Sequence, residues 1–311
     1  MPKSKPALLI LQPHLGLLSP FLEPEFTVWR FWEGPPVEAV TVIEALVVAG
    51  EFEVDKRLAE SLPRLGLIAC FTAGYDGVDL KWARERGLKV SHSPGVNFED
   101  VADHAMGLVL AAWRRIGEGD RMVRSGGWKT REKMLTPSLG GHRLGIVGLG
   151  AIGESVARRA EAFGLEVSWW GPREKPEAPW PRAESLEALA KASDILVVAA
   201  RADEGSRGLI SRTVIEAVGP AGLLVNISRG QVVDEDALIE ALRAGRLGMA
   251  ALDVFQTEPT SPEKWAGVPN TVLTPHTAGA TTGAVPRMMA LTLENLRRFF
   301  AGEALVNPVP E

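Results

Sequence analysis

The sequence reads LGIVGLGAIG at residues 144–153. The first four residues predict a short buried strand, and the remaining six fit the pattern G-x-G-x-x-G. In a dinucleotide-binding turn, Gly148 permits the tight bend, Gly150 lets the backbone approach a pyrophosphate, and Gly153 lets the helix pack closely on the strand. The pattern alone is a weak signal, because 32 of the 311 residues are glycine and such hexamers arise by chance.

The context of these glycines is what a dinucleotide-binding turn requires. An apolar strand precedes them, and Gly164 stands where the following helix is expected to end. One face of that helix is apolar at helical spacing and comprises Ile152, Val156, Ala160 and Phe163. The N-terminus of the helix would offer unpaired N–H groups to an anion. We therefore predict a dinucleotide site, with an ordinary strand–helix turn of another α/β protein as the alternative.

Short apolar runs alternate with longer helical segments along the chain, which indicates parallel βαβ units. Around the glycine motif they predict one open, doubly wound sheet with strands at 144–147, 166–170, 195–200, 223–227, 249–254 and 271–274. Upstream strands are expected at 8–11, 27–31, 40–46, 67–70 and 89–91. A helix from about Phe98 to Ile116 would join the two lobes. The last helix, about residues 285–301, has no strand after it and must pack onto a lobe already built.

Composition is that of an ordinary globular protein, with 46% hydrophobic and 23% charged residues. The length suggests about two domains. A net charge of −5 argues against a nucleic-acid partner. Cys70 is the single cysteine, so no intrachain disulfide can form, which suits a reducing cytoplasm. The apolar run at residues 7–11 is too short for a signal peptide or a membrane span.

Polar residues follow three strands of the glycine-motif sheet at their carboxyl ends, where ligands of such sheets bind. Arg229, Glu258 and His276 can therefore converge over a cofactor. A protonated histidine can donate to the oxygen of a carbonyl under reduction, a neighbouring carboxylate favours that charged form, and arginine can bind a substrate carboxylate. Each residue alone would more often be structural. The five histidines and the one cysteine form no metal-binding pattern, so we expect no metal.

The strand at 166–170 carries a signal on cofactor choice. A site for NAD usually places an acidic residue at the tip of this strand, but Gly171, Pro172 and Arg173 follow Trp170 instead. Arg173 can pair with a 2′-phosphate. We therefore expect NADP (NADPH) in preference to NAD, with a merely solvated Arg173 as the alternative.

Several stretches together carry a resemblance to a known family. They are TAGYDGVD at 72–79, SPGVN at 93–97, VADH at 101–104, the glycine motif, NISRGQVVDE at 226–235, DVFQTEP at 253–259 and PHTAG at 275–279. In this order and spacing the chain resembles the D-2-hydroxyacid dehydrogenase family, most closely its glyoxylate/hydroxypyruvate and hydroxyphenylpyruvate reductases. The resemblance covers nearly the whole chain.

The resemblance implies an α/β fold of two doubly wound lobes. One is a Rossmann dinucleotide-binding domain at residues 98–279, and the other is a flavodoxin-like, discontinuous substrate-binding domain at residues 1–97 and 280–311. This arrangement gives the last helix a lobe to pack on. The resemblance also implies a homodimer formed through the nucleotide-binding lobes. Some relatives insert a partner aromatic side chain into the active site; the matching segment here, residues 133–135, offers Met134 or Leu135.

The resemblance also implies roles for single residues. Arg229, Glu258 and His276 match the catalytic residues, and Ala73 and Gly74 match the loop whose N–H groups hold the substrate carboxylate, together with Arg229 and His276. The expected cofactor-binding residues are Gly148, Gly150, Ala151, Ile152, Gly153, Arg173, Ile227, Ser228, Asp253 and Gly279, with Asp253 near the nicotinamide amide. Related NADPH reductases often carry arginine where this chain has Pro172, and often proline where it has Arg201. Arg201 is either a second phosphate contact or solvated.

These observations together predict an NADPH-dependent reductase of small 2-oxo acids such as glyoxylate and hydroxypyruvate, with His276 as the proton donor. One alternative is an NAD-linked dehydrogenase of the same family acting on another substrate, such as a phosphorylated acid. A second alternative, from another class, is a nucleotide-sensing binding protein on the same fold. We expect a cytoplasmic protein with a small-molecule substrate and no nucleic-acid or membrane partner.

Overall fold

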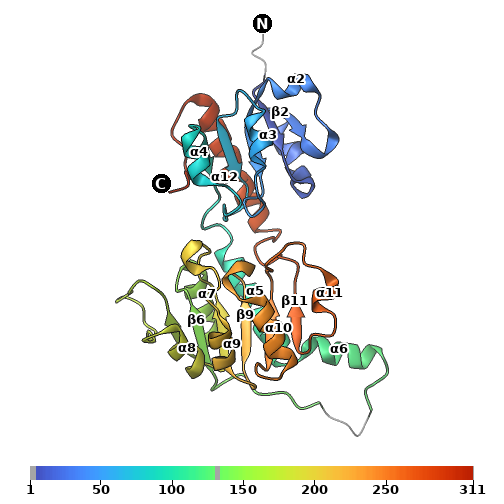
Figure 1. The fold of residues 1–311 in the computed structure, drawn as a ribbon, viewed down its shortest axis with the longest axis vertical. Coiled ribbons are helices and arrows are strands. Elements are labelled where there is room, and N and C mark those ends of the chain that lie inside the picture. Colours follow the sequence, from blue (N-terminus) through green and yellow to red (C-terminus); the bar gives the residue numbers. More distant parts are fainter. Residues whose placement is uncertain (1–4, 130–133, 311) are drawn as a thin grey trace. The chain divides into compact units, whose positions relative to one another are not determined.

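The computed structural model describes residues 5–129 and 134–310, and the chain divides into two compact units (Figure 1). One unit comprises Met1–Asn97 and Thr282–Glu311, and the other comprises Phe98–Thr281. Each is a parallel sheet with helices packed on it, so the prediction of two doubly wound α/β lobes is confirmed.

The discontinuous unit is built on a sheet whose strand order, among the described residues, is β2-β1-β3-β4-β5. This is the flavodoxin-like order, which reverses between β1 and β3. The strands are β1 Ala7–Ile10, β2 Thr27–Arg30, β3 Ile43–Val48, β4 Leu67–Cys70 and β5 Lys89–Ser91. The helices are η1 Pro13–Leu18, α1 Ser19–Leu22, η2 Phe31–Glu33, α2 Val37–Val40, α3 Lys56–Glu60, α4 Leu80–Glu85 and α12 Ala284–Ala301.

Both faces of this sheet are covered, and alternate residues of each strand point to opposite faces. On β1, Leu8 and Ile10 pack with residues of η1, α1 and α12, whereas Leu9 packs with residues of α2 and α3. Met288 and Leu296 of α12 are buried in the first of these cores. The C-terminal helix therefore supplies one layer of a sheet whose strands all lie near the N-terminus.

The continuous unit has the strand order β11-β10-β9-β8-β6-β7 among the described residues. The strands are β6 Arg143–Val147, β7 Glu166–Trp170, β8 Ile195–Val198, β9 Leu223–Asn226, β10 Met249–Leu252 and β11 Thr271–Leu273. Beyond β7, Arg182 forms a further parallel bridge with Trp169. With that segment counted as the third strand along the chain, the order becomes the Rossmann order, which reverses between β6 and β8.

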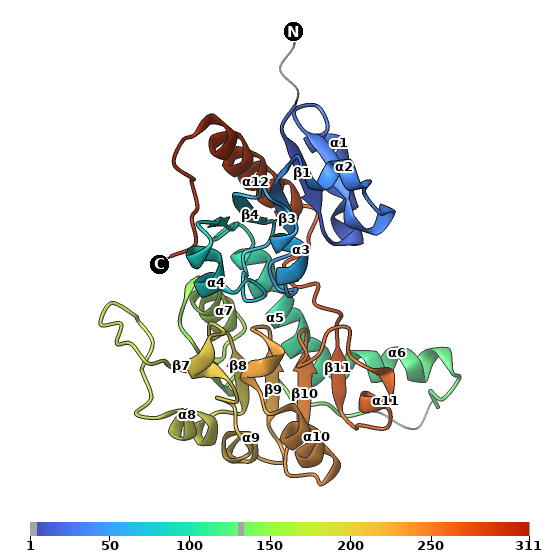
Figure 2. The ribbon, with the colours of Figure 1, turned by 45° about the horizontal axis from the view of Figure 1, so that its top comes forward.

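Helices cover both faces of the second sheet (Figure 2). On one side lie α5 (Phe98–Trp113) and α7 (Ala151–Ala162), and on the other lie α8 (Leu186–Ala192), α9 (Arg212–Val218) and α10 (Glu235–Arg243). The remaining helices of the unit are α6 Ile116–Arg124, η3 Glu204–Ser206, η4 Gly230–Val232 and α11 Pro262–Trp265. Because both faces are buried at the middle of the sheet, β8 and β9 are buried along their whole length and are almost entirely apolar.

Two expected elements differ from the structure by three residues at one end, whereas the ends of the other expected strands agree within two residues. The strand expected at residues 40–46 is β3 at Ile43–Val48, because Pro36 caps a helical turn, α2, that takes up Val40. The helix expected to reach Ile116 ends at Trp113, since Arg115 adopts a left-handed conformation with φ of 50°. A separate helix, α6, then begins at Ile116.

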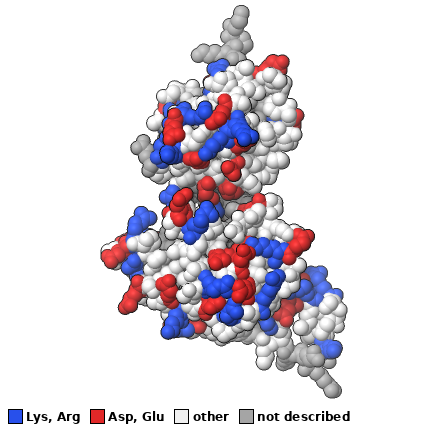
Figure 3. Space-filling model, viewed as in Figure 1, with Lys and Arg blue, Asp and Glu red and all other residues white. Residues whose placement is uncertain are grey.

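Acidic and basic side chains are interspersed over the face of the molecule in Figure 3, as the modest net charge of −5 suggests. Within residues 5–129 and 134–310, no helix combines the length and the apolar character needed to cross a membrane. In the same ranges, no three metal-ligating side chains come together.

Candidate active site

His276 and Glu258 form a hydrogen-bonded pair in the Phe98–Thr281 unit. Nδ1 of His276 lies 2.6 Å from Oε2 of Glu258. About a quarter of each side chain is exposed, 26% for His276 and 22% for Glu258, so the pair is shielded but still reachable. Such a pair fixes the orientation of the imidazole and stabilises its charged form.

The carboxyl group of Glu258 is held in its ionised form. Its partial burial is the largest single effect and raises the pKa, but the hydrogen bond and the charge of His276 are the largest of several effects that together lower it by more. The backbone N–H of Phe255 donates to Oε1 at 2.9 Å, and the positive charge of Arg229 acts in the same direction. The pKa of Glu258 therefore lies below its ordinary value, and its negative charge persists beside His276.

Arg229 lies at the carboxyl end of β9, in a tight loop built by its neighbours. The side chain of Asn226, 1% exposed, accepts from the Ser228 N–H and donates to the Arg229 carbonyl, both at 3.0 Å. Gly230 packs so closely on the backbone after β10 that a Cβ atom there would lie 1.8 Å from the carbonyl carbon of Phe255. This close approach brings the Arg229 loop against the segment that carries Glu258.

Asp253, at the end of β10, holds the loop that carries His276. Its carboxylate accepts from the N–H groups of Thr277 and Ala278, both at 2.9 Å, and from the hydroxyl of Thr274 at 2.6 Å. The N–H of His276 donates to the Asp253 carbonyl at 2.8 Å. His276 itself is in the left-handed region, with φ of 52°, which non-glycine residues seldom adopt. The loop keeps this conformation because a single buried carboxylate binds three of its donors.

A second buried carboxylate fixes the loop that carries Glu258. Glu235, 4% exposed, accepts from the Gln256 N–H at 2.9 Å and forms an ion pair with Lys264 at 2.6 Å. Both oxygens are therefore bound, which a buried charge requires. No linear motif marks Glu235 or Lys264 for this role, because the sequence does not show that α10 and α11 meet at this loop.

The glycine turn has the geometry that a dinucleotide site needs. Gly148 has φ of 94° and lies at the reversal of strand order, where a Cβ would lie 2.6 Å from the Cα of Ala200. A Cβ on Gly153 would lie 2.2 Å from the carbonyl oxygen of Gly148, so helix and strand touch there. A Cβ on Gly150 would meet nothing within 4 Å. Gly150 is the N-cap residue of the 12-residue α7, so this end of the helix is open to an approaching group.

Comparison with known proteins identifies the family. Residues 106–278 match the family model described as D-isomer specific 2-hydroxyacid dehydrogenase, NAD binding domain. The chain is 41% identical to glyoxylate/hydroxypyruvate reductase A HPR2 of Arabidopsis thaliana and 41% identical to hydroxyphenylpyruvate reductase of Plectranthus scutellarioides, over 97% of this chain and 98% of each relative. The chain belongs to the D-isomer-specific 2-hydroxyacid dehydrogenase family. It is an NAD(P)-dependent oxidoreductase, and the resemblance found in the sequence is confirmed.

A solved structure of this family shares the fold throughout. The NADPH-dependent glyoxylate/hydroxypyruvate reductase from Sinorhizobium meliloti, in complex with NADP and malonate, superposes with a TM-score of 0.89 at 32% identity, covering 98% of this chain and 97% of that one. The two-unit α/β fold is therefore that of 2-hydroxyacid dehydrogenases.

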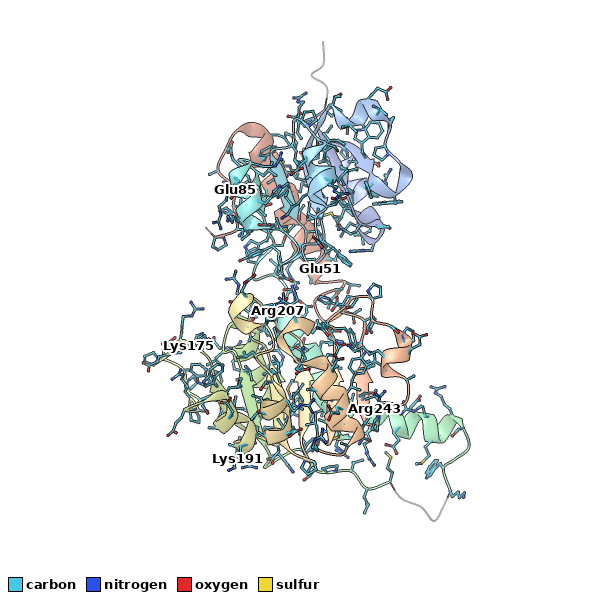
Figure 4. The ribbon with its side chains drawn as sticks, viewed as in Figure 1. Glu51, Glu85, Lys175, Lys191, Arg207 and Arg243 are labelled. Atoms are coloured by element: carbon cyan, nitrogen blue, oxygen red, sulfur yellow. The ribbon has the colours of Figure 1, made fainter. Side chains whose placement is uncertain are left out.

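The tip of β7 gathers basic side chains in this family member. Arg173 is exposed and, within the described parts of the chain, makes no hydrogen bond or ion pair. Lys175, labelled in Figure 4, forms an ion pair with Glu154 of α7 at 2.7 Å. Arg182 donates to the Gly171 carbonyl at 2.8 Å and so braces the turn before Arg173. No acidic residue stands at the tip of the strand itself.

The Ala73–Gly74 loop lies in the other unit, at the carboxyl end of β4. The Ala73 carbonyl accepts from Nδ1 of His92 at 2.9 Å. Gly74 packs so closely on Gly50 that a Cβ on Gly50 would lie 2.0 Å from the Gly74 oxygen. Both loop residues are partly exposed.

The other residues expected at the cofactor differ in exposure. Ile227 and Ser228 are buried, and the Ser228 hydroxyl donates to the carbonyl of Ala200. The remaining ones are accessible: Ala151, Ile152 and Gly279. Of the segment expected to reach a partner subunit, Lys133 lies outside the described residues, Met134 is partly exposed and Leu135 is exposed.

Proposed function

We propose that the protein is an NADPH-dependent reductase of small 2-oxo acids such as glyoxylate and hydroxypyruvate, with His276 as the proton donor. The observation that carries the proposal is the 2.6 Å hydrogen bond between His276 Nδ1 and Glu258 Oε2, with the charge of Arg229 acting on the same carboxylate. The names of the relatives support the same substrate class.

Each residue of this cluster has a distinct role in the proposal. A bound reduced nicotinamide supplies hydride to the keto carbon. His276 delivers a proton from Nε2 to the carbonyl oxygen as negative charge develops there, since Nδ1 is bound to Glu258. Arg229 binds the substrate carboxylate and polarises the carbonyl. The 2-oxo acid, one hydride and one proton give the 2-hydroxy acid.

The Phe98–Thr281 unit is proposed to hold the dinucleotide, and the discontinuous unit to bind the substrate. Backbone N–H groups of Ala73 and Gly74 would hold the substrate carboxylate. In the cofactor site, Gly148, Gly150 and Gly153 shape the pyrophosphate turn. Asp253 acts there through the loop it pins, because its two oxygens already bind protein donors.

The preference for NADPH rests on the tip of β7. Arg173 is exposed beside a strand end that lacks an acidic residue, and a guanidinium pairs well with a 2′-phosphate. A carboxylate at that position would instead bind the ribose hydroxyls of NAD. The bound NADP of the Sinorhizobium meliloti reductase supports this choice.

A homodimer formed through the continuous unit is part of the proposal. The segment from α6 to Leu135 exposes large apolar side chains: Ile116 at 57%, Val123 at 59%, Trp128 at 68% and Leu135 at 87%. We infer a subunit contact here, because exposed large apolar side chains that gather on one surface mark interaction sites. A monomer in light scattering at micromolar concentration would overturn the dimer, and Trp128→Ser is expected to weaken it.

One assay tests the activity against its alternatives. Purified protein is mixed with NADPH or NADH and, separately, glyoxylate, hydroxypyruvate, hydroxyphenylpyruvate and 3-phosphohydroxypyruvate. Oxidation of NADPH with the small acids supports the proposal. A preference for NADH with the phosphorylated acid would favour the NAD-linked dehydrogenase, and cofactor binding without any oxidation would favour a nucleotide-sensing protein.

A further inference from the structure

A second histidine contacts the base of the His276 loop. His104 lies in the middle of α5, and its Nε2 is 3.0 Å from the hydroxyl oxygen of Thr274 and 3.4 Å from Oδ1 of Asp253. The contact spans 170 positions of sequence between His104 and Thr274. The His104 side chain is 25% exposed, whereas Asp253 is 1% exposed. His104, Thr274 and Asp253 thus form a row of hydrogen-bonded side chains, in which His104 is the most exposed and Asp253 is buried.

The direction of the hydrogen bonds in this row follows from the chemistry of its groups. The Asp253 carboxylate accepts from backbone N–H groups through both oxygens, so it is the acceptor for the Thr274 hydroxyl as well. A hydroxyl has one proton, and Thr274 gives it to Asp253 at 2.6 Å. The Thr274 oxygen must then accept from His104. The proton of His104 is therefore on Nε2.

The same carboxylate fixes the backbone on either side of His276. Asp253 binds the hydroxyl of Thr274 before it and the N–H groups of Thr277 and Ala278 after it. His276 is held between these points in its left-handed conformation. A displacement of Thr274 or of the Asp253 carboxylate would therefore move His276 relative to Glu258.

We propose that His104 is a positioning residue for the reduction: its Nε2–H orients Thr274 and Asp253 so that His276 is held at Glu258. This inference rests on the function proposed above. It adds His104 to the residues that support the reaction, and His104 acts through Thr274 and Asp253. Loss of the donor leaves the Thr274 oxygen without its partner and lets the hydroxyl turn toward the Leu252 carbonyl, 3.5 Å away. The constraint on the His276 loop is then weaker.

Kinetics of three variants separate positioning from general stability. His104→Leu removes the donor, and His104→Gln restores an N–H at similar reach. Asp103→Asn on the same helix breaks only an exposed ion pair with Arg159 and is the matched control. We expect His104→Leu to lower kcat for glyoxylate with NADPH by about 10-fold or more, since small misplacements of reacting groups are costly. The KM for NADPH should stay unchanged, His104→Gln should recover most of kcat, and Asp103→Asn should match wild type.

A spectroscopic measurement does not depend on turnover. In protein labelled with ¹⁵N-histidine, a long-range ¹H–¹⁵N spectrum reports the tautomer of each ring. The His104 signals are expected to show a protonated Nε2, and the His276 signals to shift in His104→Leu but not in Asp103→Asn. If the wild-type protein shows these spectra but reduces no 2-oxo acid, the proposed function is wrong, whereas the role of His104 in positioning His276 still holds. A His104 proton on Nδ1, unchanged kcat in His104→Leu, or no recovery in His104→Gln would each overturn the inference.

Discussion

His276 and Glu258 lie 18 residues apart in sequence, yet their side chains meet at 2.6 Å through Nδ1 and Oε2. One follows β11 and the other follows β10, and both strands end at the same edge of the sheet. Two buried carboxylates, Asp253 and Glu235, bind the backbone of the loops that bring them together. The pair is thus the product of two separately fixed loops.

Replacement of either partner in the pair should lower turnover by different amounts. His276→Ala removes the proposed proton donor, and we expect kcat with a 2-oxo acid to fall by about 100- to 10,000-fold. Glu258→Gln keeps the shape but removes the charge that favours protonated His276, so the loss should be smaller. Steady-state kinetics measure both, and the proton-donor role fails if His276→Ala retains full activity.

Removal of Arg229 should affect both binding and chemistry. We expect Arg229→Ala to raise the KM for the 2-oxo acid and to lower kcat by about 100-fold or more, because a charge-assisted contact to the reacting group is lost. Arg229→Lys should recover little, since an ammonium cannot reproduce the planar fork. Arg243→Ala, an exposed arginine of α10 labelled in Figure 4, is the control and should behave as wild type.

Arg173 should decide the choice between the two dinucleotides. In Arg173→Ala, we expect the KM for NADPH to rise by about 10-fold, because one charge-assisted contact to the 2′-phosphate is lost. The KM for NADH should stay the same, because NADH has no 2′-phosphate. Lys191→Ala, an exposed cation of α8, controls for a general change in charge. Equal changes for both dinucleotides, or none for either, would show that the arginine is only solvated.

The glycines of the turn should separate cofactor binding from stability. Gly153→Ala places a Cβ 2.2 Å from the Gly148 oxygen, and we expect it to destabilise the fold by about 1–3 kcal/mol. Gly150→Ala meets nothing within 4 Å, so the free protein should keep its stability within about 1 kcal/mol while its affinity for NADPH falls. Denaturant unfolding and fluorescence titration of the dinucleotide measure the two effects. Unimpaired binding by Gly150→Ala would contradict the proposed pyrophosphate cradle.

Stability should depend on pH through Asp194, which binds the Arg143 guanidinium at 2.9 Å and the Arg143 N–H at 2.8 Å. The hydrogen bond from Arg143 lowers the pKa of Asp194 in the folded chain. Its stabilising effect is therefore fully present above the unfolded pKa of about 3.9 and is lost as pH falls through the lower folded value. Asp194→Asn should cost about 1 kcal/mol at pH 7. The difference from wild type should shrink in denaturant unfolding as the pH falls below about 4.

Patterns of a few residues were enough to predict most of the fold. Apolar runs placed the strands, and the three glycines predicted the turn that the structure forms at the reversal between β6 and β8. The predicted bounds of β3 and α5 were wrong because, in each case, a single residue ended the structure that the spacing of apolar residues predicts. Pro36 capped a helical turn that displaced β3, and Arg115 ended α5 early.

The sequence by itself determined the two parallel sheets, the dinucleotide turn and the three polar residues at neighbouring strand ends. These features depend on local periodicity, on the backbone freedom of glycine and on the rule that parallel strands end at one edge. Only the tertiary structure decided which nitrogen of His276 binds Glu258 and that Asp253 fixes the loop that carries His276. It also decided that His104 lies beside Asp253 and that Lys264 pairs with Glu235. The reason is physical: hydrogen bonds between side chains of different elements depend on how helices pack on the sheet, and no linear spacing encodes that packing.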